Sequence, residues 1–263
     1  MPQYFGFFGN ASDQWGDSIS ESYSYTNLHW VDGCDTNKII RARAMGAKVI
    51  INAIPYVFAY PTTNTSELRP NLQAWWMVLS PELQATVVAF LVADEPFRAN
   101  DKHYHLTDDD LNYRLNSAAQ WLKSFTGKAM CICASGPEFD KWGVPASFDW
   151  IGMYRYSYNT HWTQLGYSFI NLMRKLRAHQ SMVAVMDAYA DVNHPINESR
   201  IKSFNSWWQS YIGWYGSRVV AVAPFLYQSP KMGDLPVYGA TSMPRVLADL
   251  QSYALKITRG AVA

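Results

Sequence analysis

The chain has 263 residues, and its 22 basic and 21 acidic side chains leave a net charge of +1 near neutral pH. Charged residues make up 16% of the sequence, against about 25% in an average soluble domain, and aromatic residues make up 15%. Because no run of Lys or Arg provides the field that attracts a phosphate backbone, we expect no nucleic-acid partner. No apolar run reaches the ~20 residues of a membrane span, so we expect no membrane partner either.

The amino-terminal residues lack the basic and apolar regions of a secretory signal, so no signal peptide is expected in this chain. Among the cysteines, Cys131 and Cys133 lie two positions apart, where a strand would place both on one face without bridging geometry. We interpret them as buried free thiols. The compartment and the oligomeric state are left open by the sequence.

Short segments rich in β-branched and aromatic residues are predicted as strands. They are residues 4–8, 27–31, 48–54, 87–93, 129–134, 149–154, 182–187 and 219–227. Some of these segments are apolar at consecutive positions, as at Val49, Ile50 and Ile51. Consecutive apolar residues are typical of parallel strands that are covered on both faces.

The segments between these strands are predicted as helices. They are residues 38–45, 68–79, 108–125, 163–179, 198–215 and 243–255. Thr107 is the expected N-cap of the third helix, the aspartates after it favour the first turn, and Gly127 ends the helix. Residues 10–26 show no clean helical period. The repeated alternation of strand and helix predicts an α/β fold, a single-domain (β/α)8 TIM barrel that spans residues 1–263.

In such a barrel the functional side chains come from the carboxyl ends of the strands and from the loops that follow them. The sharpest feature at these ends is the acid pair Asp94 and Glu95, which follows the fourth strand and precedes Pro96. Two acids after a buried strand are costly unless they are solvated, paired or hydrogen-bonded. They are therefore either functional or part of an ordinary turn before the proline.

The segment Asp94, Glu95 and Pro96 resembles the Asn-Glu-Pro motif of the clan A glycoside hydrolases, which are retaining enzymes on an eightfold α/β barrel. The resemblance implies that Glu95 is the catalytic acid/base, with Asp94 as a neighbouring carboxylate that helps it hold a proton. It also implies a nucleophile at the end of the seventh strand, where this chain has Asp187.

Two departures from the clan A pattern bear on the chemistry. The seventh strand offers Asp187 rather than Glu, and the eighth ends with Tyr227 and Gln228 where the clan often has Trp. A retaining pair needs carboxyl groups ~5–5.5 Å apart and an inverting pair ~6.5–9.5 Å, so the shorter Asp either draws the strand end inward or changes the outcome to inversion. The alternative for Asp187 is a structural acid that pairs with Arg155. The reserve partners for Glu95 are Glu138, Asp191 and Asp32.

The resemblance thus implies a glycoside hydrolase that cleaves an oligo- or polysaccharide with Glu95 as general acid/base and Asp187 as nucleophile or base. In the clan a tyrosine near the end of the sixth strand often hydrogen bonds the nucleophile, a role open to Tyr154 and Tyr156. The side chains expected to bind the sugar are Asp94, Asn52, Trp30, Tyr56, Tyr154, Tyr156, Tyr189 and Gln228.

No cofactor is expected, because nucleotide-binding glycine motifs are absent from the sequence. No metal is expected either, since His103 and His105 lack further convergent ligands. The competing function is a barrel that binds carbohydrate without cleaving it, alone or as a module of a larger assembly, and Asp187 in place of Glu favours it. The adjacent tryptophans at 75–76 and 207–208 are assigned to packing, with one ring of each pair facing the barrel.

Overall fold

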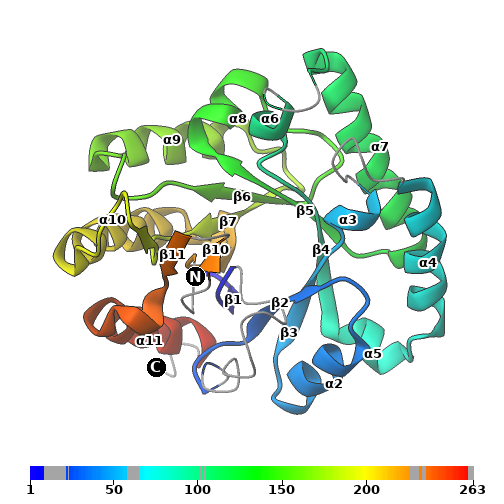
Figure 1. Ribbon diagram of the computed structural model, residues 1–263, viewed down its shortest axis with the longest axis horizontal. Coiled ribbons are helices and arrows are strands. Elements are labelled where there is room, and N and C mark those ends of the chain that lie inside the picture. Colours follow the sequence, from blue (N-terminus) through cyan, green and yellow to red (C-terminus); the bar gives the residue numbers. More distant parts are fainter. Residues whose placement is uncertain are drawn as a thin grey trace.

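The computed structural model describes residues 1–8, 22, 24–57, 65–100, 102, 105–225, 231–232 and 235–259. Its central element is one sheet of eight parallel strands in the spatial order β1-β9-β7-β6-β5-β4-β3-β2. The strands are β1 (Tyr4–Phe5), β2 (Leu28–Asp32), β3 (Lys48–Asn52), β4 (Val87–Asp94), β5 (Ala129–Ser135), β6 (Trp150–Tyr154), β7 (Ser181–Val185) and β9 (Val219–Val222). Figure 1 shows them around a common axis with helices outside, so the predicted α/β barrel is confirmed.

The helices form the outer layer of the barrel in Figure 1. They are α2 (Thr36–Ala44), α3 (Ile54–Val57), α4 (Thr65–Val78), α5 (Pro81–Thr86), α6 (Pro96–Ala99), α7 (Asp108–Thr126), α8 (Gly136–Trp142), α9 (Trp162–Lys175), α10 (Glu198–Tyr215) and α11 (Pro244–Thr258), with the 3-10 turns η3 (Gly216–Arg218) and η4 (Ala240–Ser242). The six predicted helices are present with small shifts at their ends. The short helices α3, α5, α6 and α8 were not predicted, because four to seven residues are too few to show a helical period.

Five strands are shorter than predicted: β1, β3, β6, β7 and β9. Phe8 and Asp187 lie beyond the ends of β1 and β7, and each joins Phe225 through a single bridge. The predicted strand 219–227 is continuous only to Val222, and its last two residues lie outside the described ones. Most of the segment 10–26 also lies outside them.

The barrel closes where β1 meets β2. The backbone N–H of Asn27 donates to the carbonyl of Phe5 at 3.0 Å, and the Asn27 side chain accepts from the Phe5 N–H at 2.8 Å. Gly6 makes this approach possible, because a Cβ at that position would lie 1.8 Å from the carbonyl oxygen of Leu28. The seam therefore depends on a residue without a side chain.

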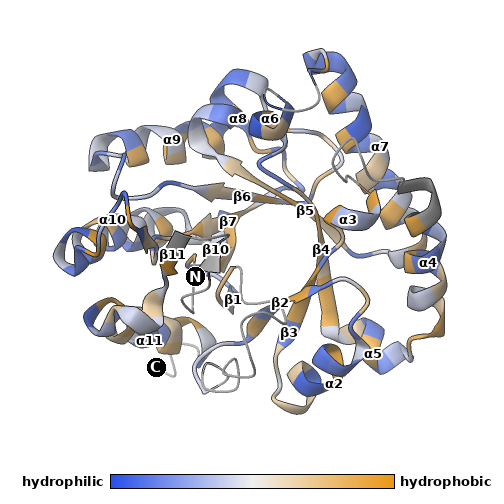
Figure 2. Cartoon of the chain, in the orientation of Figure 1, coloured by the Kyte–Doolittle hydropathy of each residue, from blue (hydrophilic) through white to orange (hydrophobic). Residues whose placement is uncertain are grey.

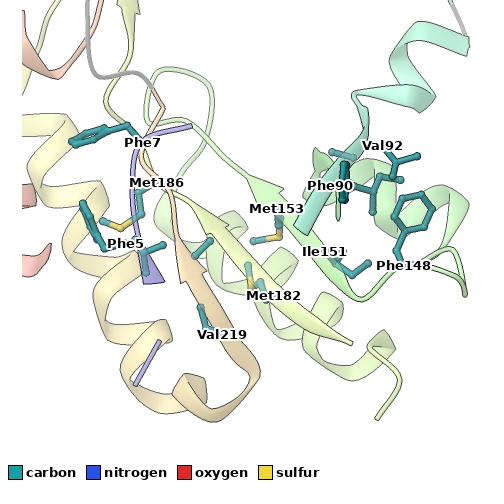
Figure 3. Packing of buried hydrophobic residues seen from close by; sticks show 14 of the residues in the cluster. Phe5, Phe7, Phe90, Val92, Phe148, Ile151, Met153, Met182, Met186 and Val219 are labelled. Atoms are coloured by element: carbon teal, nitrogen blue, oxygen red, sulfur yellow. The ribbon is translucent and has the colours of Figure 1, made fainter. Parts of the chain in front are cut away.

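Two apolar layers hold the barrel together. Inward-facing residues such as Leu28, Ile50 and Leu91 fill the interior, and the next residues along the strands pack outward against the helices. Figure 3 shows part of the outer layer, including Phe90 and Met182. In Figure 2 the strands are mostly hydrophobic, and the helices that surround them carry hydrophilic residues on their outer faces. This is the pattern expected for a parallel sheet buried on both faces.

A second, three-stranded antiparallel sheet was not predicted. It consists of β8 (Ala190–Asp191), β10 (Lys231–Met232) and β11 (Leu235–Tyr238), in the order β10-β11-β8. Because β8 follows the carboxyl end of β7, this sheet belongs to the mouth side of the barrel. Among the described residues, no helix has the length and apolar character required to cross a membrane.

Candidate active site

Glu95 occupies a strained turn directly after β4. Its backbone angles, φ 47° and ψ 40°, place it in the left-handed region, and its N–H donates to the carbonyl of Cys133 at 2.9 Å. Among the described residues, His105 is the only other non-glycine residue with positive φ. Such conformations cost free energy and occur preferentially at functional sites. The unusual backbone conformation thus falls on Glu95, the residue that the sequence motif indicates.

The Glu95 carboxylate is held by two donors. The Tyr154 hydroxyl donates to Oε1 at 2.6 Å, and the Arg98 guanidinium donates to Oε2 at 3.1 Å. Both contacts are charge-assisted, since the acceptor is a carboxylate. Arg98 is exposed and Glu95 is partly exposed, so the ion pair is open to solvent and to an incoming ligand.

A second carboxylate, that of Glu138, lies beside the same phenol. Its Oε2 is 3.5 Å from the Tyr154 hydroxyl oxygen and accepts a hydrogen bond from the backbone N–H of Ser135 at 2.7 Å. Because both distances meet at one atom, Oε1 of Glu95 and Oε2 of Glu138 are at most about 6 Å apart, which is compatible with a retaining pair. Glu138 is fixed at this place by its role as capping residue of α8.

These groups surround a cavity of about 390 Å³, within the usual size of a small-ligand site. It is formed by the loops after β4, β5 and β6, and its walls combine carboxylates, arginines and aromatic rings. The lining residues are Glu95, Arg98, Ser135, Pro137, Glu138, Trp142, Tyr154, Arg155, Tyr156, Tyr158 and Asn159. Among the described residues, no three His, Cys, Asp or Glu side chains group in a way that could hold a metal ion.

Asp94 faces the inside of the barrel mouth. It pairs in register with the inward-facing Cys133, and although it is exposed, protein surrounds it on most sides. This partial desolvation, followed by the nearby carboxylates of Glu95 and Glu138, raises the pKa of Asp94 to about 7. Asp94 is therefore a group that can hold a proton near neutral pH.

Asp94→Asn is expected to stabilise the protein more at high pH than at low pH. Because the pKa of Asp94 is raised on folding, its stabilising contribution is complete below about pH 4 and is lost as the pH rises through about 7. The variant does not titrate there, so its Tm should match that of the unmodified protein at pH 4 and exceed it by about 2–4 °C at pH 8, allowing for exposure of the group to solvent. Calorimetry of both proteins at both pH values measures this difference in Tm. The contributions of other titrating groups cancel, because both proteins contain them. An equal Tm difference at both pH values would contradict the assignment.

Three tyrosines extend from Glu95 along the wall of the cavity. The rings of Tyr154 and Tyr156 stack at 5.3 Å and 20°, and those of Tyr156 and Tyr158 at 5.7 Å and 15°. Tyr154 ends β6, and Tyr158 lies in the turn that follows, where the Asn159 N–H donates to the Tyr156 carbonyl at 3.4 Å. Tyr154 and Tyr156 were predicted from the sequence and Tyr158 was not, although it continues the same two-residue spacing.

Asp187, the predicted partner of Glu95, is completely buried and does not line the cavity. Its Oδ2 accepts from the Ser157 N–H at 2.7 Å and its Oδ1 from the Tyr189 N–H at 3.2 Å. Burial raises the pKa of Asp187 to about 6 against the opposing effect of these hydrogen bonds. No ion pair joins Asp187 to Arg155, the alternative partner, and the Arg155 guanidinium donates to Ser168 Oγ at 3.0 Å. A nucleophilic or basic role for Asp187 stays a prediction.

Five of the predicted sugar-binding residues do not line this cavity: Asp94, Asn52, Trp30, Tyr56 and Tyr189. Asn52 donates from its side-chain amide to Asp32 at 2.9 Å, which ties the ends of β3 and β2 together. Trp30 is buried inside the barrel, where its ring meets the edge of Phe8 at 5.3 Å. Asp32, one of the reserve acids, is engaged by the hydrogen bond from Asn52.

Tyr56 and Tyr189 are also placed by structural contacts. The Tyr56 hydroxyl lies over Gly33, and burial raises the pKa of Tyr56 to about 12. The Tyr189 hydroxyl donates to Asp191 at 2.6 Å, and Asp191 also binds His194. Gln228 lies outside the described residues.

The cavity also contains residues that sequence analysis did not propose. Arg98 stands one helical turn after Glu95, and this spacing could have identified it. Trp142 also lines the cavity. Its ring stacks on Phe97 at 5.1 Å, and the Lys141 ammonium lies 3.7 Å from its centroid. Trp142 comes from α8, a helix too short to be recognised from the sequence.

The parallel barrel of eight strands is a fold found in glycoside hydrolases of known structure. The structure is similar to that of a GH113 β-1,4-mannanase, with a TM-score of 0.63 at 12% identity over 97% of this chain and 99% of that one. A glycoside hydrolase family 17 β-1,3-glucanosyltransferase from Rhizomucor miehei gives 0.61 at 12% identity, over 88% and 90% of the two chains. A β-glucosidase from Exiguobacterium marinum gives 0.61 at 9% identity, over 90% and 86%. No protein-family profile and no curated protein sequence matches the chain.

Proposed function

We propose that this protein is a glycoside hydrolase that cleaves an oligo- or polysaccharide, with Glu95 as general acid/base. The observation that carries the proposal is the placement of the Glu95 carboxylate, from a strained turn, in a cavity that it shares with a second carboxylate. Glu95 would protonate the glycosidic oxygen as the bond to the anomeric carbon breaks, and would later take the proton of the attacking water.

The geometry favours Glu138 as the partner of Glu95. Glu138 lines the same cavity and lies within about 6 Å of Glu95 by their contacts with Tyr154, a separation that suits attack on the anomeric carbon and retention of configuration. The resemblance to clan A favours Asp187 instead. For Asp187 to act, its carboxylate would have to give up the backbone N–H groups of Ser157 and Tyr189.

Two variants distinguish these partners. Glu138→Gln keeps a carbonyl oxygen for the Ser135 N–H, so the variant should fold and lose hydrolysis by about 10²–10⁴-fold. Asp187→Asn should lower Tm, because its amide group cannot accept both backbone N–H bonds, and should keep most of its kcat. Reducing-end release from a panel of oligosaccharides measures turnover, and proton NMR of the first product identifies the anomer. The reverse outcome would assign the partner role to Asp187.

A non-catalytic carbohydrate-binding barrel is the second candidate. It is favoured by the existing engagement of the Glu95 carboxylate, both of whose oxygens already accept hydrogen bonds. For such a protein no glycan would be turned over, and Glu95→Gln would alter only affinity.

A further inference from the structure

A second, larger cavity adjoins the first. It has a volume of about 590 Å³ and lies between the loop that follows β6 and the helix α10. Tyr158 and Asn159 line both cavities, so the two share a wall. Tyr158 is also the last ring of the tyrosine series that begins at Glu95.

Two stacked tryptophans form one side of this second cavity. Trp162, the first residue of α9, lies 4.7 Å from Trp207 of α10 with an angle of 13° between the rings, and it is 42% exposed. Helix α10 already anchors itself in the core through Trp208, which is completely buried. Packing accounts for Trp208 and for part of Trp207, which also contacts the core. It leaves the exposed ring of Trp162 unexplained, and large exposed rings beside polar groups are typical of binding surfaces.

The charge in this cavity is positive and unpaired. Arg200 lines it, no Asp or Glu does, and the Arg200 guanidinium makes no hydrogen bond or ion pair with any residue in the part of the chain that the structure describes. The negative group that influences it electrostatically is Asp187, whose oxygens are taken by the N–H groups of Ser157 and Tyr189. A free guanidinium offers two parallel donors to a carboxylate or sulfate.

We propose that the second cavity is a carbohydrate subsite for an anionic glycan. In it a sugar ring packs on the Trp162–Trp207 platform while Arg200 binds an acidic substituent of the chain. The glycan continues past Tyr158 into the cavity of Glu95. The subsite rests on the proposed function in that the same glycan is the substrate, and it restricts that substrate to acidic chains longer than the first cavity can hold.

Binding is measured on the Glu95→Gln protein, so that affinity is scored without turnover. The probes are hexasaccharides in three forms: an oligogalacturonate, its methyl ester, which has the same backbone without charge, and a sulfated carrageenan fragment. At least one acidic probe should bind, and Trp162→Ala and Arg200→Gln should each weaken it about tenfold or more. Preference for the uronate identifies a carboxylate ligand, and preference for the carrageenan fragment identifies a sulfate.

Matched controls are available at exposed residues outside the cavity. Trp214→Ala removes another exposed tryptophan of α10, and Arg114→Gln removes an exposed arginine of α7, and neither should change affinity. Binding of the methyl ester alone, binding that is unchanged in both cavity variants, or no binding of any probe would overturn the subsite. Turnover by the unmodified chain is scored separately: binding as expected without turnover refutes the hydrolase and leaves the subsite, whereas turnover with unaffected binding refutes only the subsite.

Discussion

Glu95→Gln is expected to reduce glycoside hydrolysis by about 10²–10⁴-fold and to leave substrate affinity nearly unchanged. Glutamine has the size of glutamate and keeps an oxygen that can accept from the Tyr154 hydroxyl, but it cannot give or take a proton. The lost ion pair with Arg98 is exposed and contributes about 0–1 kcal/mol to stability, so the variant should fold. Steady-state kinetics with calorimetric binding separates kcat from affinity.

Glu82→Gln provides the matched control, since this exposed glutamate lies in the first turn of α5, outside the cavity. Its kinetics should equal those of the unmodified protein. A Glu95 variant that retains full turnover would remove Glu95 from the mechanism, whereas an unmodified protein without turnover would favour the binding module.

Gly6→Ala is expected to cause the largest loss of stability. The added Cβ would lie 1.8 Å from the Leu28 carbonyl oxygen, a backbone atom that cannot rotate away. Strands β1 and β2 must separate, which breaks the hydrogen bond from the Asn27 N–H to Phe5. We expect a loss of at least about 3 kcal/mol in the free energy of unfolding, at the upper end for overpacked interiors. Urea unfolding followed by circular dichroism measures it.

The control for this variant is Gly213→Ala in α10. Among the described residues, no atom outside the local backbone of α10 lies within 4 Å of a Cβ at that position. The only expected effect is therefore the better helix propensity of alanine, a gain of about 0.5–1 kcal/mol. Equal stabilities of the two variants would show that the seam between β1 and β2 tolerates separation.

The local signals in the sequence predicted the fold well. The Thr107 hydroxyl accepts from the Asp110 N–H at 3.2 Å as the N-cap of α7, and Gly127 ends that helix with φ 63°. Glu95 was selected as the candidate acid/base for a similar reason, because an acid pair before proline at a strand end is a local pattern. Such features depend on a few neighbouring residues and can therefore be read from the sequence alone.

Whether a side chain at a strand end points into or out of the barrel could not be predicted in the same way. In β4 the register shifts between Leu91 and Ala93, so Val92 and Ala93 both pack outward and Asp94 turns inward. Simple alternation from the inward Leu91 would have turned Asp94 outward. Whether a residue such as Trp30 or Asn52 enters the mouth, fills the interior or ties two strands together is decided by register and by the neighbouring strand.

The left-handed backbone of Glu95 also sets a limit for engineering. A glycine at this position would relieve about 1–2 kcal/mol of steric cost, so a library selected only for heat resistance would discard the carboxylate. Selection for thermostability would then enrich glycine at position 95, and screening for catalysis would enrich glutamate. Position 95 should accordingly be held fixed in any attempt to make a hardier form of the protein.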